Sequence, residues 1–148
     1  MVSNASIHLN LQVIYLCEYM QVELDETTRF IYITWLKHTS SEKFREMYQV
    51  IAEITIEHKA EYCLSDARAI HYIEFADQNW IIQHMAPLLN TTSVKQFARL
   101  TNKESLTLMD AARVFTALEN LPHVQSRTQF NVFTSKADAY TWLFPEIA

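Results

Sequence analysis

The segment from Thr39 to Arg68, TSSEKFREMYQVIAEITIEHKAEYCLSDAR, constrains the fold more than any other part of the chain. Thr39 and Glu42 match a capping box, and apolar residues follow at helical spacing, at Phe44, Met47, Tyr48, Ile51 and Ile54. This pattern predicts a helix that ends near Lys59. The apolar stretch 61–65 is too short for another helix, so it predicts a strand. The segment is therefore typical of a strand-helix-strand unit in an α/β domain.

The segments on both sides predict one α/β domain over residues 1–148. Upstream, residues 19–24 and 29–36 flank a polar turn at Asp25 and predict a β-hairpin, while 9–16 alternates like a strand or an extended arm. Residues 30–36 are apolar on both faces, as in a central strand. Downstream, the pattern predicts a helix from Ala76 or Asp77 that Pro87 ends or kinks, and then a strand at 94–100. A helix over 108–118, stopped by Leu121-Pro122, follows. The last elements are a strand at 130–133 and a closing helix that begins at Ser135 and Asp138. This alternation implies a mixed sheet with parallel, right-handed crossovers.

The chain contains no glycine, and this excludes whole classes of chemistry. Phosphate-binding loops and sharp nucleophile turns need residues without a Cβ at fixed positions. Dinucleotide-binding, Walker A and nucleophile-elbow motifs are therefore absent. The turns must instead be built from Asp, Asn, Ser and the three prolines, as at 25–28 and 90–93.

Charge and hydropathy narrow the expected partners and location. The net charge of −5, with no cluster of Lys and Arg, argues against binding to nucleic acid. No stretch reaches the roughly 20 apolar residues that a membrane helix needs, and the first residues lack a secretory pattern. We therefore expect a cytoplasmic protein. Cys17 and Cys63 are too few for a disulfide framework or a zinc site.

Several short motifs share one order along the chain: Trp35, Ser41-Glu42-Lys43-Phe44-Arg45-Glu46, Leu64-Ser65-Asp66-Ala67-Arg68, Asp77-Gln78-Asn79-Trp80 and Ala139-Tyr140-Thr141-Trp142-Leu143. In this they resemble the bacterial SpoIIAA-like proteins, which belong to the superfamily of STAS and Sec14 (CRAL-TRIO) folds. The resemblance spans roughly residues 15 to 144. It implies a SpoIIAA-like mixed β-sheet in which an N-terminal hairpin precedes alternating helices and strands. It also implies a regulatory module that forms a homodimer or binds a protein partner.

In the anti-sigma-factor antagonists of that superfamily, a serine at the start of the second helix is phosphorylated. A phosphate there would meet the free backbone N–H groups of the helix N-terminus. This chain has no Ser or Thr between Asp66 and Trp80, so the resemblance does not extend to the switch. Ser65 is the nearest hydroxyl, and we interpret it as a structural residue at the end of a strand.

The residues that follow the strand at 61–65 form the candidate ligand- or partner-binding site: Asp66, Arg68, His71, Tyr72, Asp77 and Trp80. Asp66 and Arg68 should lie at the carboxyl edge of the parallel strands, where α/β domains place ligands. They either anchor a polar or anionic ligand or cap a loop. Trp80 is the aromatic residue expected nearest this corner. The other aromatic residues are core, pocket wall or interface: Phe30, Tyr32, Trp35, Phe44, Tyr48, Phe97 and Phe115.

We expect neither a catalytic site nor a metal or cofactor. The spacing of His71, Glu74 and His84 matches no metal-ligand motif. Cys63 lies in an apolar strand, and the sequence pattern gives it no histidine partner of the kind that a nucleophilic cysteine needs. The leading hypothesis is a non-enzymatic regulatory or protein-interaction module that uses the loop from Asp66 to Asp77. The alternative is a Sec14-like carrier of a lipid or another apolar small molecule, with the aromatic residues as pocket walls.

Overall fold

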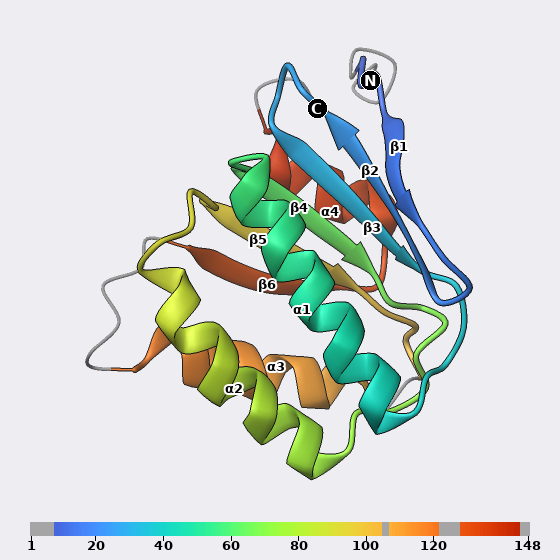
Figure 1. Cartoon of the computed structure of the whole chain (residues 1–148), viewed down its shortest axis with the longest axis vertical. Coiled ribbons are helices and arrows are strands. Elements are labelled where there is room, and N and C mark those ends of the chain that lie inside the picture. Colours follow the sequence, from blue (N-terminus) through green and yellow to red (C-terminus); the bar gives the residue numbers. More distant parts are fainter. Residues whose placement is uncertain (1–7, 105–106, 122–127, 146–148) are drawn as a thin grey trace.

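The structure is a computed structural model of the chain and describes residues 8–104, 107–121 and 128–145. These residues form one mixed sheet covered by helices (Figure 1). The strands are β1 (Gln12–Leu16), β2 (Met20–Asp25), β3 (Phe30–Trp35), β4 (Tyr62–Asp66), β5 (Gln96–Leu100) and β6 (Gln129–Phe133). The helices are α1 (Ser41–Glu57), α2 (Phe75–Leu89), α3 (Thr107–Glu119) and α4 (Lys136–Leu143). None of the helices described is long and apolar enough to cross a membrane.

The six strands of the sheet follow one another in chain order. β1, β2 and β3 pair antiparallel, which confirms the hairpin and makes the 9–16 segment a third antiparallel strand, with a bulge between Val13 and Tyr15. β3, β4, β5 and β6 pair in parallel, so the predicted mixed sheet is confirmed. Each crossover connects a parallel strand to its next neighbour on the same side, and all the crossovers have the same handedness. α1, α2 and α3 therefore cover one face of the sheet.

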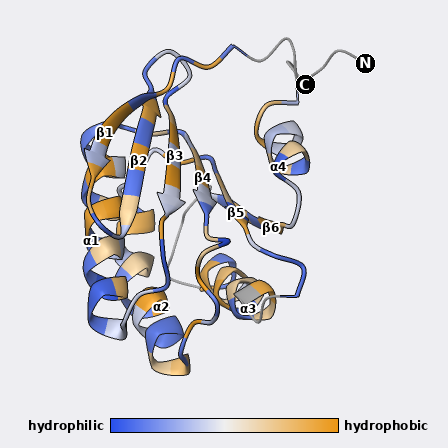
Figure 2. Cartoon of the chain, turned by 90° about the vertical axis from the view of Figure 1, so that its right-hand side faces the viewer, coloured by the Kyte–Doolittle hydropathy of each residue, from blue (hydrophilic) through white to orange (hydrophobic). Residues whose placement is uncertain are grey.

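The sheet separates two hydrophobic cores. On the first face, α1, α2 and α3 bury residues such as Met47, Ile81 and Val114 against the strands. On the second face, which α4 covers, Leu143 of α4 and Phe144 just after it are buried against the sheet (Figure 2). β3 lies between both layers, and this explains why nearly all of its residues are buried, as predicted for a central strand.

The ends of the helices differ in detail from the sequence prediction. The N-cap of α1 is Ser40 and not Thr39: Ser40 is extended, and its hydroxyl accepts a hydrogen bond from the Lys43 amide at 3.4 Å. Thr39 is buried in the preceding loop, so the predicted capping box is wrong. α2 begins at Phe75 and continues through Pro87 to Leu89. Pro122 lies outside the described residues. The predicted Ser135 cap of α4 is confirmed.

Among the described residues, two adopt the left-handed conformation that glycine usually supplies. Arg29 closes the β2–β3 turn with φ of 56°, and Lys59 follows the C-cap of α1 with φ of 50°. A side chain with a Cβ pays about 1–2 kcal/mol in this region of backbone space. The absence of glycine therefore places local strain at these two turns.

Candidate functional site

Asp66, the last residue of β4, is held by residues of the same chain. Arg68 donates to both carboxylate oxygens, from Nε at 2.9 Å and from Nη2 at 2.7 Å, and the Tyr32 hydroxyl donates at 3.1 Å. Burial alone would raise the pKa of Asp66, but the hydrogen bonds and the charge of Arg68 outweigh it and lower that pKa. The carboxylate is thus ionised, and its charge is matched within the corner itself.

Asp77 and Trp80 join α2 to α1. Asp77 is buried and accepts hydrogen bonds from Arg45 Nε at 2.8 Å and from the Ser41 hydroxyl at 2.7 Å. The Arg45 guanidinium also lies 5.6 Å from the centre of the Trp80 ring, and Trp80 stacks on His84 at 4.4 Å. This arrangement fixes the packing of the two helices.

His71 and Tyr72 pack around His38, a residue that the sequence analysis did not single out. The His71 amide donates to His38 Nδ1 at 3.1 Å, and the His38 ring lies 5.2 Å from that of His71 and 4.5 Å from that of Tyr72. Burial, and then the neighbouring His71, lowers the pKa of His38, so its ring is neutral at physiological pH. A neutral Nδ1 accepts the amide hydrogen, which holds the loop after β4 against the end of β3.

A polar crevice of about 200 Å³ separates this loop from the start of α1. Tyr72 and Asp77 line it together with His38, Ser41 and Glu74, whereas Asp66, Arg68 and Trp80 do not. The predicted site residues therefore do not form one site. Asp66 and Arg68 form the corner after β4, Asp77 and Trp80 contact α1, and His71 and Tyr72 pack on His38. Within residues 8–104, 107–121 and 128–145, no group of three or more His, Cys, Asp or Glu side chains is arranged to hold a metal ion.

Large apolar side chains are exposed where the β4–α2 loop meets α3. Tyr72 is 47% exposed, Phe75 64% and Met109 76%. Arg113, one turn after Met109, stacks on the Phe75 ring at 4.4 Å, and the Ile73 amide donates to Asp110 at 3.3 Å. These contacts bring the loop and α3 together, and we call Tyr72, Phe75 and Met109 the carboxyl-edge patch.

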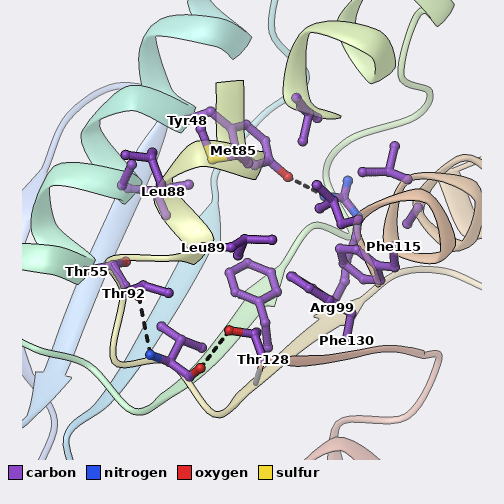
Figure 3. A pocket seen from close by; sticks show the side chains of 18 of the residues that line it. Tyr48, Thr55, Met85, Leu88, Leu89, Thr92, Arg99, Phe115, Thr128 and Phe130 are labelled. Carbon is purple, nitrogen blue, oxygen red and sulfur yellow. Dashed lines mark hydrogen bonds between the residues drawn. The ribbon is translucent and has the colours of Figure 1, made fainter. Parts of the chain in front are cut away.

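An apolar cavity of about 90 Å³ lies between α1, α2, α3 and the sheet (Figure 3). Its walls are mainly aliphatic and aromatic, and Arg99 of β5, which lines it, donates a hydrogen bond from Nη1 to the Tyr48 hydroxyl of α1 at 3.2 Å. Pockets for drug-sized ligands begin at about 300 Å³, and a lipid needs still more room. The cavity thus does not favour the lipid-carrier alternative.

Comparison with known proteins identifies the fold and nothing finer. No protein-family profile and no curated protein sequence matches the chain. Among solved structures, an uncharacterised protein of the DUF3478 family from Shewanella loihica, described as having a SpoIIAA-like fold, superposes with a TM-score of 0.50. The alignment covers 91% of this chain and 93% of the other at 14% identity. The chain has a SpoIIAA-like fold.

On this SpoIIAA-like fold, Ser65 lies inside the first core. It is almost fully buried on β4, and its hydroxyl accepts a hydrogen bond from the Trp35 indole at 3.1 Å. A phosphoryl group on Ser65 would need space and solvent that this packing does not provide. The position agrees with the interpretation of Ser65 as a structural residue.

The sequence analysis missed Phe75, Met109 and Arg99. Phe75 was expected in a loop, and Met109 falls outside the apolar face of α3 that Leu108, Ala111 and Phe115 mark. An apolar residue that lies off the apolar face of its helix is expected to be exposed, so the position of Met109 could have indicated this. Arg99 lies in a predicted strand, and its position two residues from Phe97 placed it on the same buried face.

Proposed function

We propose that this chain is a non-enzymatic regulatory module that binds a protein partner through the carboxyl-edge patch. The exposure of Tyr72, Phe75 and Met109 beside Arg113 carries the proposal. Tyr, Phe, Met and Arg are the residue types enriched in protein interfaces. The exposed aromatic side chains of Tyr72 and Phe75 also offer the kind of anchor that contributes most of the binding free energy in an interface.

The loop that carries the patch is braced from several sides, which favours binding. Besides the contact between Ile73 and Asp110, the Asn102 side chain donates to the Arg68 carbonyl at 2.9 Å. The Asp66–Arg68 pair holds the beginning of the same loop. A preorganised loop loses little conformational entropy when a partner binds. In this proposal Asp66 and Arg68 position the loop, and Tyr72 and Phe75 contact the partner.

The chemistry of the remaining candidate groups supports a module without catalysis. Burial raises the pKa of the Cys63 thiol to about 12, so the thiolate that a nucleophile requires does not form at neutral pH. Asp77 is engaged by Arg45 and Ser41. Cys17 and Cys63 are both free thiols, which fits our proposal that the protein works in the reducing cytoplasm.

Substitutions at the patch test the proposal. Met109→Ser and Phe75→Ser change exposed side chains, so both variants should fold as the parent does, with unchanged circular dichroism. We expect each variant to reduce the capture of specific partners from extract of the native host by about tenfold or more, measured by quantitative mass spectrometry. Ile56→Ser, at an exposed apolar residue in the last turn of α1, is the matched control and should leave capture unchanged. Equal capture by all variants would refute the proposed surface.

We also propose that the chain forms a homodimer, and that β1 is the contact. β1 is an edge of the sheet, and Val13, Ile14 and Leu16 are exposed on it. The other edge, β6, is protected differently: its Phe130 amide donates to Glu119 and its Val132 amide to the Asn131 side chain. An exposed apolar edge strand is a ready template for pairing with a second copy. The unequal protection of the two edges supports the assignment of β1 to self-association.

A further inference from the structure

His38 lies between β3 and α1 and contacts the middle of the β4–α2 loop, beside which its own loop runs (Figure 1). The backbone amide of His71 donates to His38 Nδ1 at 3.1 Å. The His38 ring also lies 5.2 Å from the ring of His71 and 4.5 Å from the ring of Tyr72. One imidazole thus holds two successive residues of the loop, and Tyr72 belongs to the carboxyl-edge patch.

The contact between His38 and the His71 amide requires one protonation state of the imidazole. In a neutral imidazole one nitrogen carries a hydrogen and the other accepts a hydrogen bond. In an imidazolium both nitrogens carry hydrogens, so no rotation of the ring restores an acceptor for the His71 amide. Protonation of His38 therefore replaces this hydrogen bond with two opposed N–H groups.

Three side chains of the loop face His38 and determine where it titrates: His71, Tyr72 and Glu74. Burial, and then the neighbouring His71, lowers the pKa of His38, and the carboxylate of Glu74 acts in the opposite direction. The net result is a pKa below the ordinary value of 6.5. His38 is thus neutral above that value and takes up its proton as the pH falls below it.

The charges on the other elements around His38 are matched by their own partners. Asp77 of α2 lines the same crevice and forms an ion pair with Arg45. Lys37, the preceding residue in the chain, forms an ion pair with Glu18. The residues of α1 that line the crevice are uncharged. Among the residues that line the crevice, neither helix therefore supplies a free charge that would hold a protonated His38 in place.

Both ends of the loop are anchored independently of His38. Ile70 and Ile73 are 1% and 6% exposed, whereas His71 and Tyr72 between them are exposed. The Ile73 amide donates to Asp110, and the Ile73 carbonyl accepts a hydrogen bond from the Gln78 side chain at 2.9 Å. Loss of the His38 contact therefore releases His71 and Tyr72 while the buried ends stay in place.

We propose that His38 is a pH-sensitive switch for the β4–α2 loop. Its neutral ring holds His71 and Tyr72, and its protonation releases both residues and weakens binding at the carboxyl-edge patch. The release is a property of this chain alone, and its effect on a partner rests on the proposed function. Because a proton and an ordered loop exclude each other at His38, acidification and partner binding shift the same equilibrium in opposite directions.

Solution NMR of the full chain from about pH 8 to about pH 5 tests the release without any partner. The ring 15N resonances of His38 should identify Nδ1 as the nitrogen without a hydrogen at the upper end of this range. The amide resonances of His71 and Tyr72 should shift as the His38 ring titrates, with a midpoint below 6.5. A hydrogen on Nδ1 at about pH 8, or loop amides that do not follow the titration of His38, would overturn the proposal.

Two variants separate His38 from its neighbour. His71→Asn keeps the backbone amide and removes the second titrating ring, so the amide of residue 71 should still shift as His38 titrates. Adding His38→Asn places an amide oxygen near the position of Nδ1, where it accepts the same hydrogen bond at every pH. The shift should then disappear. An undiminished shift in the double variant would show that another group is the sensor.

Capture of partners from host extract at about pH 7.5 and about pH 5.5 connects the switch to binding. We expect the parent chain to lose about fivefold or more of its capture on acidification, and His38→Asn to lose much less. Equal losses would refute the effect of the switch on binding. Absence of patch-dependent capture at about pH 7.5 would refute the proposed function instead, and the NMR titration would still decide whether the loop switches.

Discussion

At the scale of single residues, some buried charged side chains of this chain have a partner of opposite charge and one does not. The corner after β4 contains a carboxylate whose charge is matched by Arg68, with a bond from Tyr32. Arg99, in the first core, has one hydroxyl and no charged partner. The first state contributes to the stability of the fold, whereas the second reduces it. This contrast leads to opposite predictions for two substitutions.

The stabilising effect of Asp66 should depend on pH. Its pKa in the folded state lies below the ordinary value of 3.8. The contribution of the ionised carboxylate is therefore complete above that ordinary value and is lost as the pH falls through the lowered value. We expect the difference in free energy of unfolding between the parent and Asp66→Asn to be constant from about pH 7 to about pH 5, and to shrink below about pH 4. Urea unfolding across this range measures it, and a difference that does not change with pH would contradict the assignment.

Replacing Arg99 should stabilise the chain. Arg99→Met removes a buried charge without a counter-charge, and we expect the free energy of unfolding to rise by about 1–4 kcal/mol. Arg45→Met is the matched control: it leaves the buried Asp77 without its cation and should lower the free energy of unfolding. Urea unfolding gives both values. A loss of stability in Arg99→Met equal to that in Arg45→Met would contradict the interpretation of Arg99 as a buried charge without a counter-charge.

At the scale of secondary structure, the absence of glycine is visible at the end of α1. Lys59 adopts φ of 50° just after the C-cap His58, a place that glycine usually occupies. Lys59→Gly should relieve this strain and raise the free energy of unfolding by about 0.5–1 kcal/mol, after the larger entropy of glycine in the unfolded state is subtracted. Lys59→Ala keeps a Cβ and should give no gain. Stabilisation by alanine as large as that by glycine would show that the lysine side chain, and not the backbone, is the source.

Most elements were predictable from local patterns, and the misses have local causes. α1, the hairpin and the closing helix follow from periodicity and caps that need no distant partner. The choice of Ser40 over Thr39 as N-cap depended on which hydroxyl the neighbouring loop buries, and that is a tertiary fact. The partners of Asp66 and Asp77 were likewise invisible, because Tyr32 and Arg45 approach from elements more than 30 residues away.

At the scale of the whole molecule, the sequential order of the strands leaves β1 and β6 as the edges of the sheet. The proposed homodimer uses β1, where Leu16 is 62% exposed. Leu16→Lys places a charge on this edge and should shift the chain from dimer to monomer without loss of folded structure. Analytical ultracentrifugation over a range of concentrations measures the change, with Met109→Lys at the distant patch as the control. A parent chain that stays monomeric at all concentrations would exclude the dimer.

Site-specific photocrosslinking in living cells of the native host can capture a contact between the carboxyl-edge patch and a protein partner. A photoreactive phenylalanine analogue at position 75 should yield a defined crosslinked product that contains a second, different protein, identified by mass spectrometry. The same analogue at position 16 should yield at most a product between two copies of this chain. Crosslinking from position 75 that gives no discrete product, or only the products seen from position 16, would contradict the claim.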